Sequence, residues 1–192
     1  MFFFYPVLDA LNSGGVIRKW VVIGLKIAAI VGLLAGLLMA VTIITAAGRG
    51  SAGALLGGII AAVIILGTAL CVAQILWYRS GSVADLTHSR YAVIPIFSVL
   101  SRAFGETAAT SMAGVGVAGC LLLWLTPAGD VAPIAGLPFI SGLAYQGGGF
   151  IAGLILIVYM VGLGFGALIG GYLWAECIIL LVDIEQNTRQ KA

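Results

Sequence analysis

Four long apolar stretches separated by short polar segments are the strongest pattern along this chain. A membrane-spanning helix needs about 20 consecutive apolar residues, because the hydrocarbon core of a bilayer is about 30 Å thick. Stretches of that length occur at 20–46, 54–78, 103–125 and 150–182. The pattern therefore predicts an all-α integral membrane protein in which four transmembrane helices form an antiparallel bundle.

The third span is preceded by a second apolar run, so two interpretations of this region are open. Either one helix runs over 93–125, or a short interfacial helix bends at Pro95 into a shorter span. We favour the single helix, about 50 Å long at 1.5 Å per residue, because the run 150–182 has the same length. The sequence then predicts two long helices that extend into the cytoplasm and pack along each other.

The remaining segments connect the spans. An aromatic start with Pro6 predicts that 1–19 holds an interfacial anchor, with a frayed terminus as the alternative, and it lacks the features of a cleaved signal. We expect a cytoplasmic connector over 79–92 and a cytoplasmic tail over 183–192. The external loop 126–149 has an apolar middle, so it either contacts the bundle or a partner, or rests on the membrane surface.

Composition sets the class of protein and its orientation. Hydrophobic residues make up 62% of the chain and charged residues 8%, and the net charge of +2 indicates no nucleic-acid partner. The segments outside the spans are too short for a separate catalytic domain. Only Arg49 falls on one side of the predicted spans, while the other side holds Arg18, Lys19, Lys26, Arg79, Arg90, Arg102, Arg189 and Lys191. Because basic residues stay on the cytoplasmic side, we expect both termini in the cytoplasm.

Candidate chemistry is sparse. Cys71, Cys120 and Cys177 each stand alone in an apolar stretch, and the single histidine, His88, falls in the connector. A metal or disulfide site needs paired or suitably spaced ligands, so we expect no metal, no cofactor and no catalytic residue. The run Gly114-x-Gly116-x-x-Gly119 matches a dinucleotide-binding fingerprint, but that motif requires a preceding strand rather than a membrane helix.

Glycines spaced by four residues are the sharpest signal in the sequence. Gly162, Gly166 and Gly170 recur in the fourth span, with Gly149 and Gly153 at the same spacing near its outer end, and we expect one helix-packing groove. Gly32 and Gly36 offer a matching face in the first span. The sequence leaves open whether the groove packs within the chain or against another molecule.

A polar cluster is predicted at the inner membrane border. Counted from the outer ends of their helices, Arg102 and Glu176 lie at similar depths, and Glu106 lies one turn from Arg102. We expect these three residues to form a clamp between the long helices. A proton or ion pathway is the alternative, although the middle of the membrane holds mainly Gly, Ala, Leu, Ile and Val.

The end of the chain carries the one family resemblance. The segment Leu181-Val182-Asp183-Ile184-Glu185-Gln186-Asn187-Thr188-Arg189, with the preceding Glu176, resembles the closing segment of small multi-span bacterial inner-membrane proteins of uncharacterised function. The resemblance implies a bacterial inner-membrane setting and no particular activity.

The function that these observations favour is a non-enzymatic accessory or scaffold subunit, which packs against other membrane proteins through its glycine-lined faces. The alternative is a small homo-oligomeric channel or transporter. A channel needs polar groups across the membrane, and the candidates are Thr42, Thr45, Thr68 and Thr110. An intramembrane enzyme is not expected, since the chain lacks paired acids, a Ser-His set and a His-rich metal set.

Overall fold

Four helices make up the structure, a computed structural model that describes residues 15–86, 93–126 and 149–189, without the side chains at 185, 186 and 189. They are α2 (Gly15–Ala47), α3 (Ala52–Ala84), α4 (Val93–Leu125) and α6 (Gly149–Arg189). Each is long and apolar enough to cross a membrane. The predicted all-α bundle of four transmembrane helices is confirmed, and the chain is a multi-pass membrane protein.

Helix lengths differ from the prediction that only two helices are long. α2, α3 and α4 each have 33 residues and α6 has 41, so all four exceed the thickness of the hydrocarbon core. α3 continues to Ala84 through residues expected in the connector, and Ser80 and Ser82 satisfy their hydroxyls within the helix by donating hydrogen bonds to Trp77 O and Tyr78 O. A polar composition alone therefore did not end this helix.

Other boundaries have local causes. Ser51 caps α3, since its hydroxyl accepts a hydrogen bond of 3.3 Å from the backbone N–H of Ala54. Pro95 falls in the first turn of α4, where a missing N–H costs no helical hydrogen bond. The structure assigns 15–19 to α2. The predicted anchor over 1–14, the loop residues 127–148, His88 and the last residues 190–192 lie outside the described residues.

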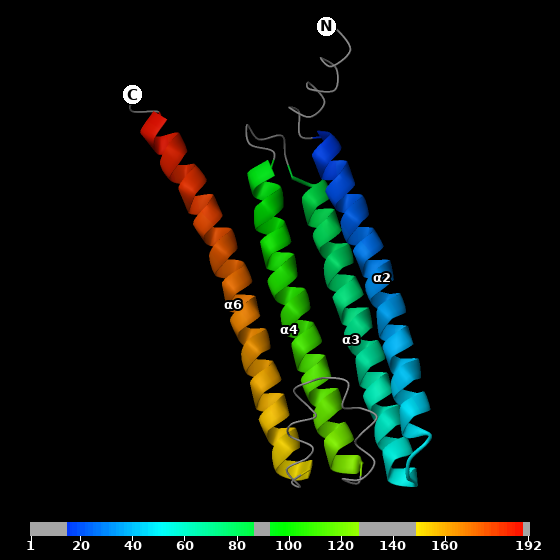
Figure 1. The fold of residues 1–192 in the computed structure, drawn as a ribbon. Helices are drawn as coiled ribbons and strands as arrows, with labels where there is room; N and C mark the ends of the chain where they lie inside the picture. The colour runs from blue at the N-terminus through cyan, green and yellow to red at the C-terminus, as the bar shows by residue number, and fades with distance from the viewer. Residues whose placement is uncertain (1–14, 87–92, 127–148, 190–192) are drawn as a thin grey trace, which may run out of the picture.

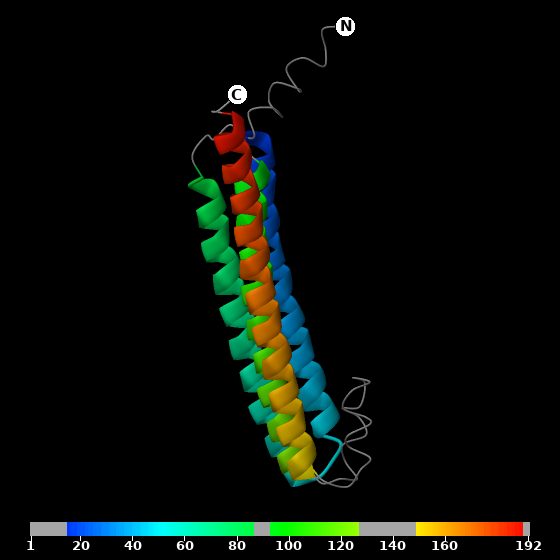
Figure 2. The ribbon, with the colours of Figure 1, turned by 90° about the vertical axis from the view of Figure 1, so that its left-hand side faces the viewer.

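The helices form a row in chain order (Figures 1 and 2). α2 packs on α3, α3 on α4, and α4 on α6, so α2 and α6 occupy the two edges of the row. The beginning of α2 and the end of α6 lie at one end of the bundle, which we call the N/C end. The short turn between α2 and α3 lies at the opposite end, which we call the turn end.

Small residues bring these helices together. A Cβ at Gly36 would collide with the Cβ of Ala69, and a Cβ at Gly58 would collide with that of Ala47, so α2 and α3 approach closely at both points. Small residues permit such approach in lipid, where van der Waals packing replaces the hydrophobic drive between helices. Between α3 and α4, the packing centres on a cluster of larger and smaller apolar residues: Ala61, Ile65, Ala118 and Leu122.

The contact between α4 and α6 depends on glycine on both helices. A Cβ at Gly171 would lie 2.9 Å from the Cα of Gly105 and 2.7 Å from the carbonyl oxygen of Ser101. Gly164 faces Ala109 in the same way, with 3.0 Å from a built Cβ to the carbonyl oxygen. These close approaches hold α6 against one face of α4.

Candidate functional site

Aromatic residues mark the two membrane borders. Near the turn end, Trp124 and Phe150 stack with ring centroids 4.9 Å apart, and the Trp124 indole donates a hydrogen bond to Phe150 O. Nearer the N/C end lie Trp77, Tyr78 and Tyr172. Phe150 and Tyr172 are separated by 22 residues of α6, about 33 Å, which is close to the thickness of a hydrocarbon core. Tyr172 therefore lies at the depth expected for the second membrane border.

An ion pair joins α3 to α4 at this border. Arg79 donates two hydrogen bonds to the Glu106 carboxylate: Nε to Oε2 at 2.9 Å, and Nη2 to Oε1. The two side chains are only 16% and 18% exposed. A two-point contact of this kind fixes the orientation of both groups as well as their separation.

Tyr172 brings α6 into the same cluster. Its hydroxyl donates to Glu106 Oε1 at 2.5 Å, and its oxygen accepts a hydrogen bond of 3.2 Å from Arg79 Nη2. The guanidinium carbon of Arg102 lies 5.5 Å from the centre of the Tyr172 ring, within cation–π range. We call these four residues, Arg79, Arg102, Glu106 and Tyr172, the Glu106 cluster; it ties three helices together.

The structure brings only part of the predicted clamp together. Arg102 and Glu106 both belong to the Glu106 cluster, where the Tyr172 ring lies beside Arg102 and the carboxylate pairs with Arg79. Glu176 is exposed and forms no ion pair or hydrogen bond with the residues that the structure describes. The prediction that Glu176 forms a clamp with Arg102 and Glu106 was wrong.

The register of the helices explains this difference. The Ser101 hydroxyl donates to Gly171 O at 3.0 Å, which places Arg102 level with Tyr172. Glu176 is four residues, about 6 Å, farther toward the N/C end. Glu176 lies one turn beyond Tyr172 and on the same side of α6 to within about 40°, so depth rather than rotation separates it from Glu106.

Sequence reasoning missed Arg79 and Tyr172. Arg79 directly follows Trp77 and Tyr78, an aromatic pair typical of a membrane border. Glu106 was expected at the same border, so Arg79 was a candidate cation to pair with its carboxylate. The shared depth of Arg79 and Glu106 could therefore have identified Arg79 as a partner of Glu106. No comparable signal identified Tyr172, because its role depends on which face of α6 meets α4.

The chemistry of the Glu106 cluster is that of a satisfied structural contact. The carboxylate accepts three hydrogen bonds from two partners, which leaves little capacity for a further ligand. Within the described ranges, no group of three or more His, Cys, Asp and Glu residues is placed to hold a metal ion. The arrangement fits a tie between helices better than a proton path.

The glycines of α6 divide between two opposite faces. Gly149 and Gly153 pack against Leu123 and Trp124 of α4. A Cβ added to either glycine would come too close to these residues. Gly162, Gly166 and Gly170 are exposed, and a Cβ at any of them would meet no atom within 4 Å. The expected single groove is therefore wrong, since the nine residues from Gly153 to Gly162 make two and a half turns.

The predicted matching face in α2 is also divided. Gly36 is buried against Ala69, whereas a Cβ at Gly32 would meet nothing within 4 Å. We call Gly162, Gly166 and Gly170 the outer glycine face of α6. It does not contribute to packing within the described part of the chain.

Comparisons with protein-family models, with curated proteins and with solved structures found no match.

Proposed function

We propose that this protein is a non-enzymatic scaffold or accessory subunit of a bacterial inner membrane, and that α6 packs against a helix of another membrane protein. The observation that carries this proposal is the outer glycine face of α6: three glycines at a spacing of four residues, all on the exposed side of an edge helix.

Lipid contact alone gives no reason for three glycines at this spacing. Each glycine in a helix costs about 0.5–1 kcal/mol relative to alanine, so three cost roughly 1.5–3 kcal/mol. Inside the bundle, comparable glycines such as Gly105 and Gly171 offset this cost by close backbone approach. The outer glycine face would offset it in the same way when a second helix packs against it.

The Glu106 cluster supports the proposal by fixing α6 in place. α6 has α4 as its main neighbour, and Tyr172 adds a hydrogen bond to Glu106 and one from Arg79 of α3. An edge helix held at several points presents its outer face in one orientation. Such preorganisation lowers the entropy that binding a partner would cost.

Site-specific photo-crosslinking in the native membrane tests this function. A photoreactive amino acid replaces Ile169, an exposed residue beside the outer glycine face, and a control probe replaces Val63 on the exposed side of α3. We expect Ile169 probes to capture a different membrane protein, and Gly166→Ile to remove that product. Equal capture by the Val63 probe, or capture that Gly166→Ile leaves unchanged, would contradict the proposal.

The opposite edge of the row favours a homo-oligomer as the second candidate. On α2, Gly24 and Gly32 are also open, and Gly32 lies 15 residues from the turn end of its helix while Gly166 lies 17 residues from that of α6. An α2 from a second copy would then meet α6 in antiparallel orientation, as all neighbours in the row do. Capture of the same chain at Ile169 would favour this assembly.

A channel receives less support than a closed assembly without a pore. Each of the four threonines proposed as pore-lining residues donates its hydroxyl proton to its own helix: Thr42 to Met39 O, Thr45 to Thr42 O, Thr68 to Ile64 O and Thr110 to Glu106 O. Thr68 also packs directly against Gly114 of α4. These contacts fit helix packing rather than a hydrated path.

A further inference from the structure

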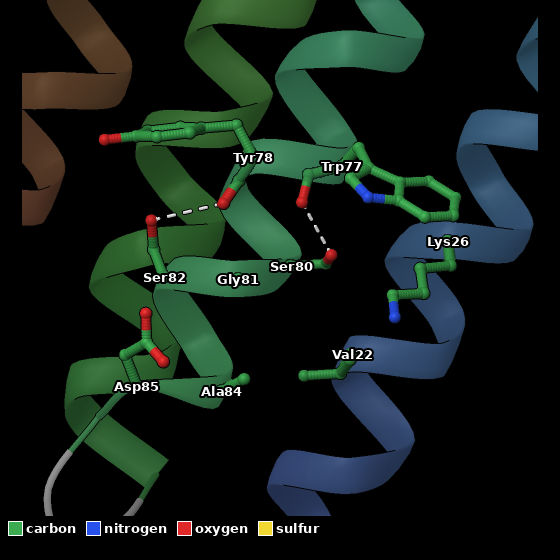
Figure 3. Close-up of a pocket in the computed structure, with 9 residues that line it drawn as sticks. All are labelled: Val22, Lys26, Trp77, Tyr78, Ser80, Gly81, Ser82, Ala84 and Asp85. Atoms are coloured by element: carbon green, nitrogen blue, oxygen red, sulfur yellow. Dashed lines mark hydrogen bonds between the residues drawn. The ribbon is translucent and has the colours of Figure 1, made fainter.

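A shallow groove of about 420 Å³ crosses the outer side of α3 near the N/C end and reaches α2 (Figure 3). Lys26 of α2 and Trp77 line it on the side toward α2, and Ser82 and Asp85 line it on the other side. Gly81 lies between them, where an added Cβ would meet no atom within 4 Å. The groove therefore has a cation at one side, a carboxylate at the other and open space between.

Neither charged group is paired within the described part of the chain. The one ion pair there joins Arg79 to Glu106, and no side-chain hydrogen bond involves Lys26 or Asp85. The Lys26 ammonium lies 5.2 Å from the centre of the Trp77 ring. A ligand that matches the groove must therefore bring an anion to Lys26 and a cation to Asp85.

Hydrogen-bonding capacity divides in the same way. Ser82 already donates its proton to Tyr78 O at 3.3 Å, so its oxygen is left as an acceptor beside Asp85. The Lys26 ammonium and the Trp77 indole N–H are donors and face the space between α2 and α3. One side thus offers donors to an oxyanion, and the other offers acceptors to a group that carries N–H.

Depth identifies where such a ligand would come from. Gly36 meets Ala69 across the α2–α3 contact, so Lys26, ten residues earlier, is level with Arg79, ten residues later. Asp85 is six residues, about 9 Å, nearer the N/C end, beyond the border marked by Trp77. The anion site thus lies toward the membrane and the cation site toward water. A phospholipid has the same order, with its phosphate at the border and its headgroup amine extending outward.

We propose that this groove binds the headgroup of a phospholipid with a primary amine, as in phosphatidylethanolamine. The phosphate accepts hydrogen bonds from Lys26 and Trp77, and the ammonium donates to Asp85 and Ser82 across Gly81. A choline headgroup has no N–H to donate, and an anionic headgroup without an amine leaves Asp85 unmatched. This inference is independent of the proposed scaffold role.

Native mass spectrometry of the full chain tests it, after exchange into equal amounts of phosphatidylethanolamine, phosphatidylcholine and phosphatidylglycerol with identical acyl chains. We expect the protein to retain phosphatidylethanolamine over phosphatidylcholine by roughly tenfold, which corresponds to about 1.4 kcal/mol. Asp85→Asn is expected to bring that ratio close to one. Lys26→Met is expected to lower retention of all three lipids.

Matched controls separate this site from general surface charge. Asp183→Asn on α6 and Lys19→Met on α2 alter exposed charges outside the groove and are expected to leave retention unchanged. Gly81→Ala adds a Cβ in the open space, where it meets no atom within 4 Å, and is expected to reduce retention of phosphatidylethanolamine. Equal retention of the three lipids by the wild type, or a preference that survives Asp85→Asn, would overturn the proposal.

Discussion

Replacing Glu106 by glutamine tests whether the Glu106 cluster holds three helices together. Glu106→Gln keeps the size of the side chain and one acceptor oxygen, but it removes the charge that pairs with Arg79. The Arg79 guanidinium, 16% exposed, is then left beside a neutral amide.

The expected cost follows from burial and depth. Removing one partner of a buried pair costs about 3–5 kcal/mol, whereas single hydrogen bonds between membrane helices average about 0.6 kcal/mol. Glu106 is 18 residues, about 27 Å, from the opposite border at Trp124, so it lies near the headgroups, where water reduces the cost. We therefore expect Glu106→Gln to lower the free energy of unfolding by about 2–3 kcal/mol.

The assay is reversible unfolding in mixed micelles, followed by helix-sensitive circular dichroism. Glu176→Gln is the matched control, because Glu176 is an exposed acid without a described partner, and its effect should stay within about 0.5 kcal/mol. Arg79→Gln combined with Glu106→Gln should cost less than the sum of the two single changes by at least about 1 kcal/mol. A cost below 0.5 kcal/mol for Glu106→Gln, or additive single effects, would refute a role for the pair in stability.

Four further outcomes follow from the packing and the charges. Gly171→Val should lower the free energy of unfolding by about 1–3 kcal/mol because it forces α6 from α4, whereas Gly166→Val should not lower it, in the same micelle assay. Trp124→Ala should cost about 1–2 kcal/mol by removing both the stack and the hydrogen bond to Phe150, and a cost no larger than 0.5 kcal/mol would contradict it. In micelles, a small maleimide should label Cys177 before Cys120, which is buried and should react only on unfolding; equal rates would be inconsistent with the packing. Reporter fusions at the chain ends should show cytoplasmic activity, because every basic residue with a described side chain except Arg49 lies toward the N/C end, and periplasmic activity would contradict the expected orientation.

The number and type of the helices could be predicted from sequence because hydrocarbon thickness imposes a length that few other folds require. The range 93–125 coincides with α4, and the rise per residue sets that helix's length directly. The ends of α2 and α3 could not be placed in this way. A serine such as Ser80 can be accommodated inside a helix when its hydroxyl bonds back to a carbonyl of that helix, so polar composition alone does not mark a helix end.

Rotation of the helices about their axes was the property that sequence did not determine. Glycine spacing identified Gly162, Gly166 and Gly170 as one face but not which way that face points, because a uniformly apolar helix has little hydrophobic asymmetry. Depth counting found Glu106 but assigned it Glu176, which lies one turn of α6, about 6 Å, beyond Tyr172. Pairing in lipid depends on both depth and rotation; residue counts give depth only to within about one turn and do not give rotation.

The most direct test of the scaffold role is native mass spectrometry of the protein extracted gently from its own membrane, without overexpression. We expect a stable complex with a different membrane protein that Gly166→Ile dissociates and that Gly67→Ile, at an isolated open glycine of α3, leaves intact. Recovery of a monomer, or of a complex that Gly166→Ile does not affect, would contradict a docking role for the outer glycine face of α6.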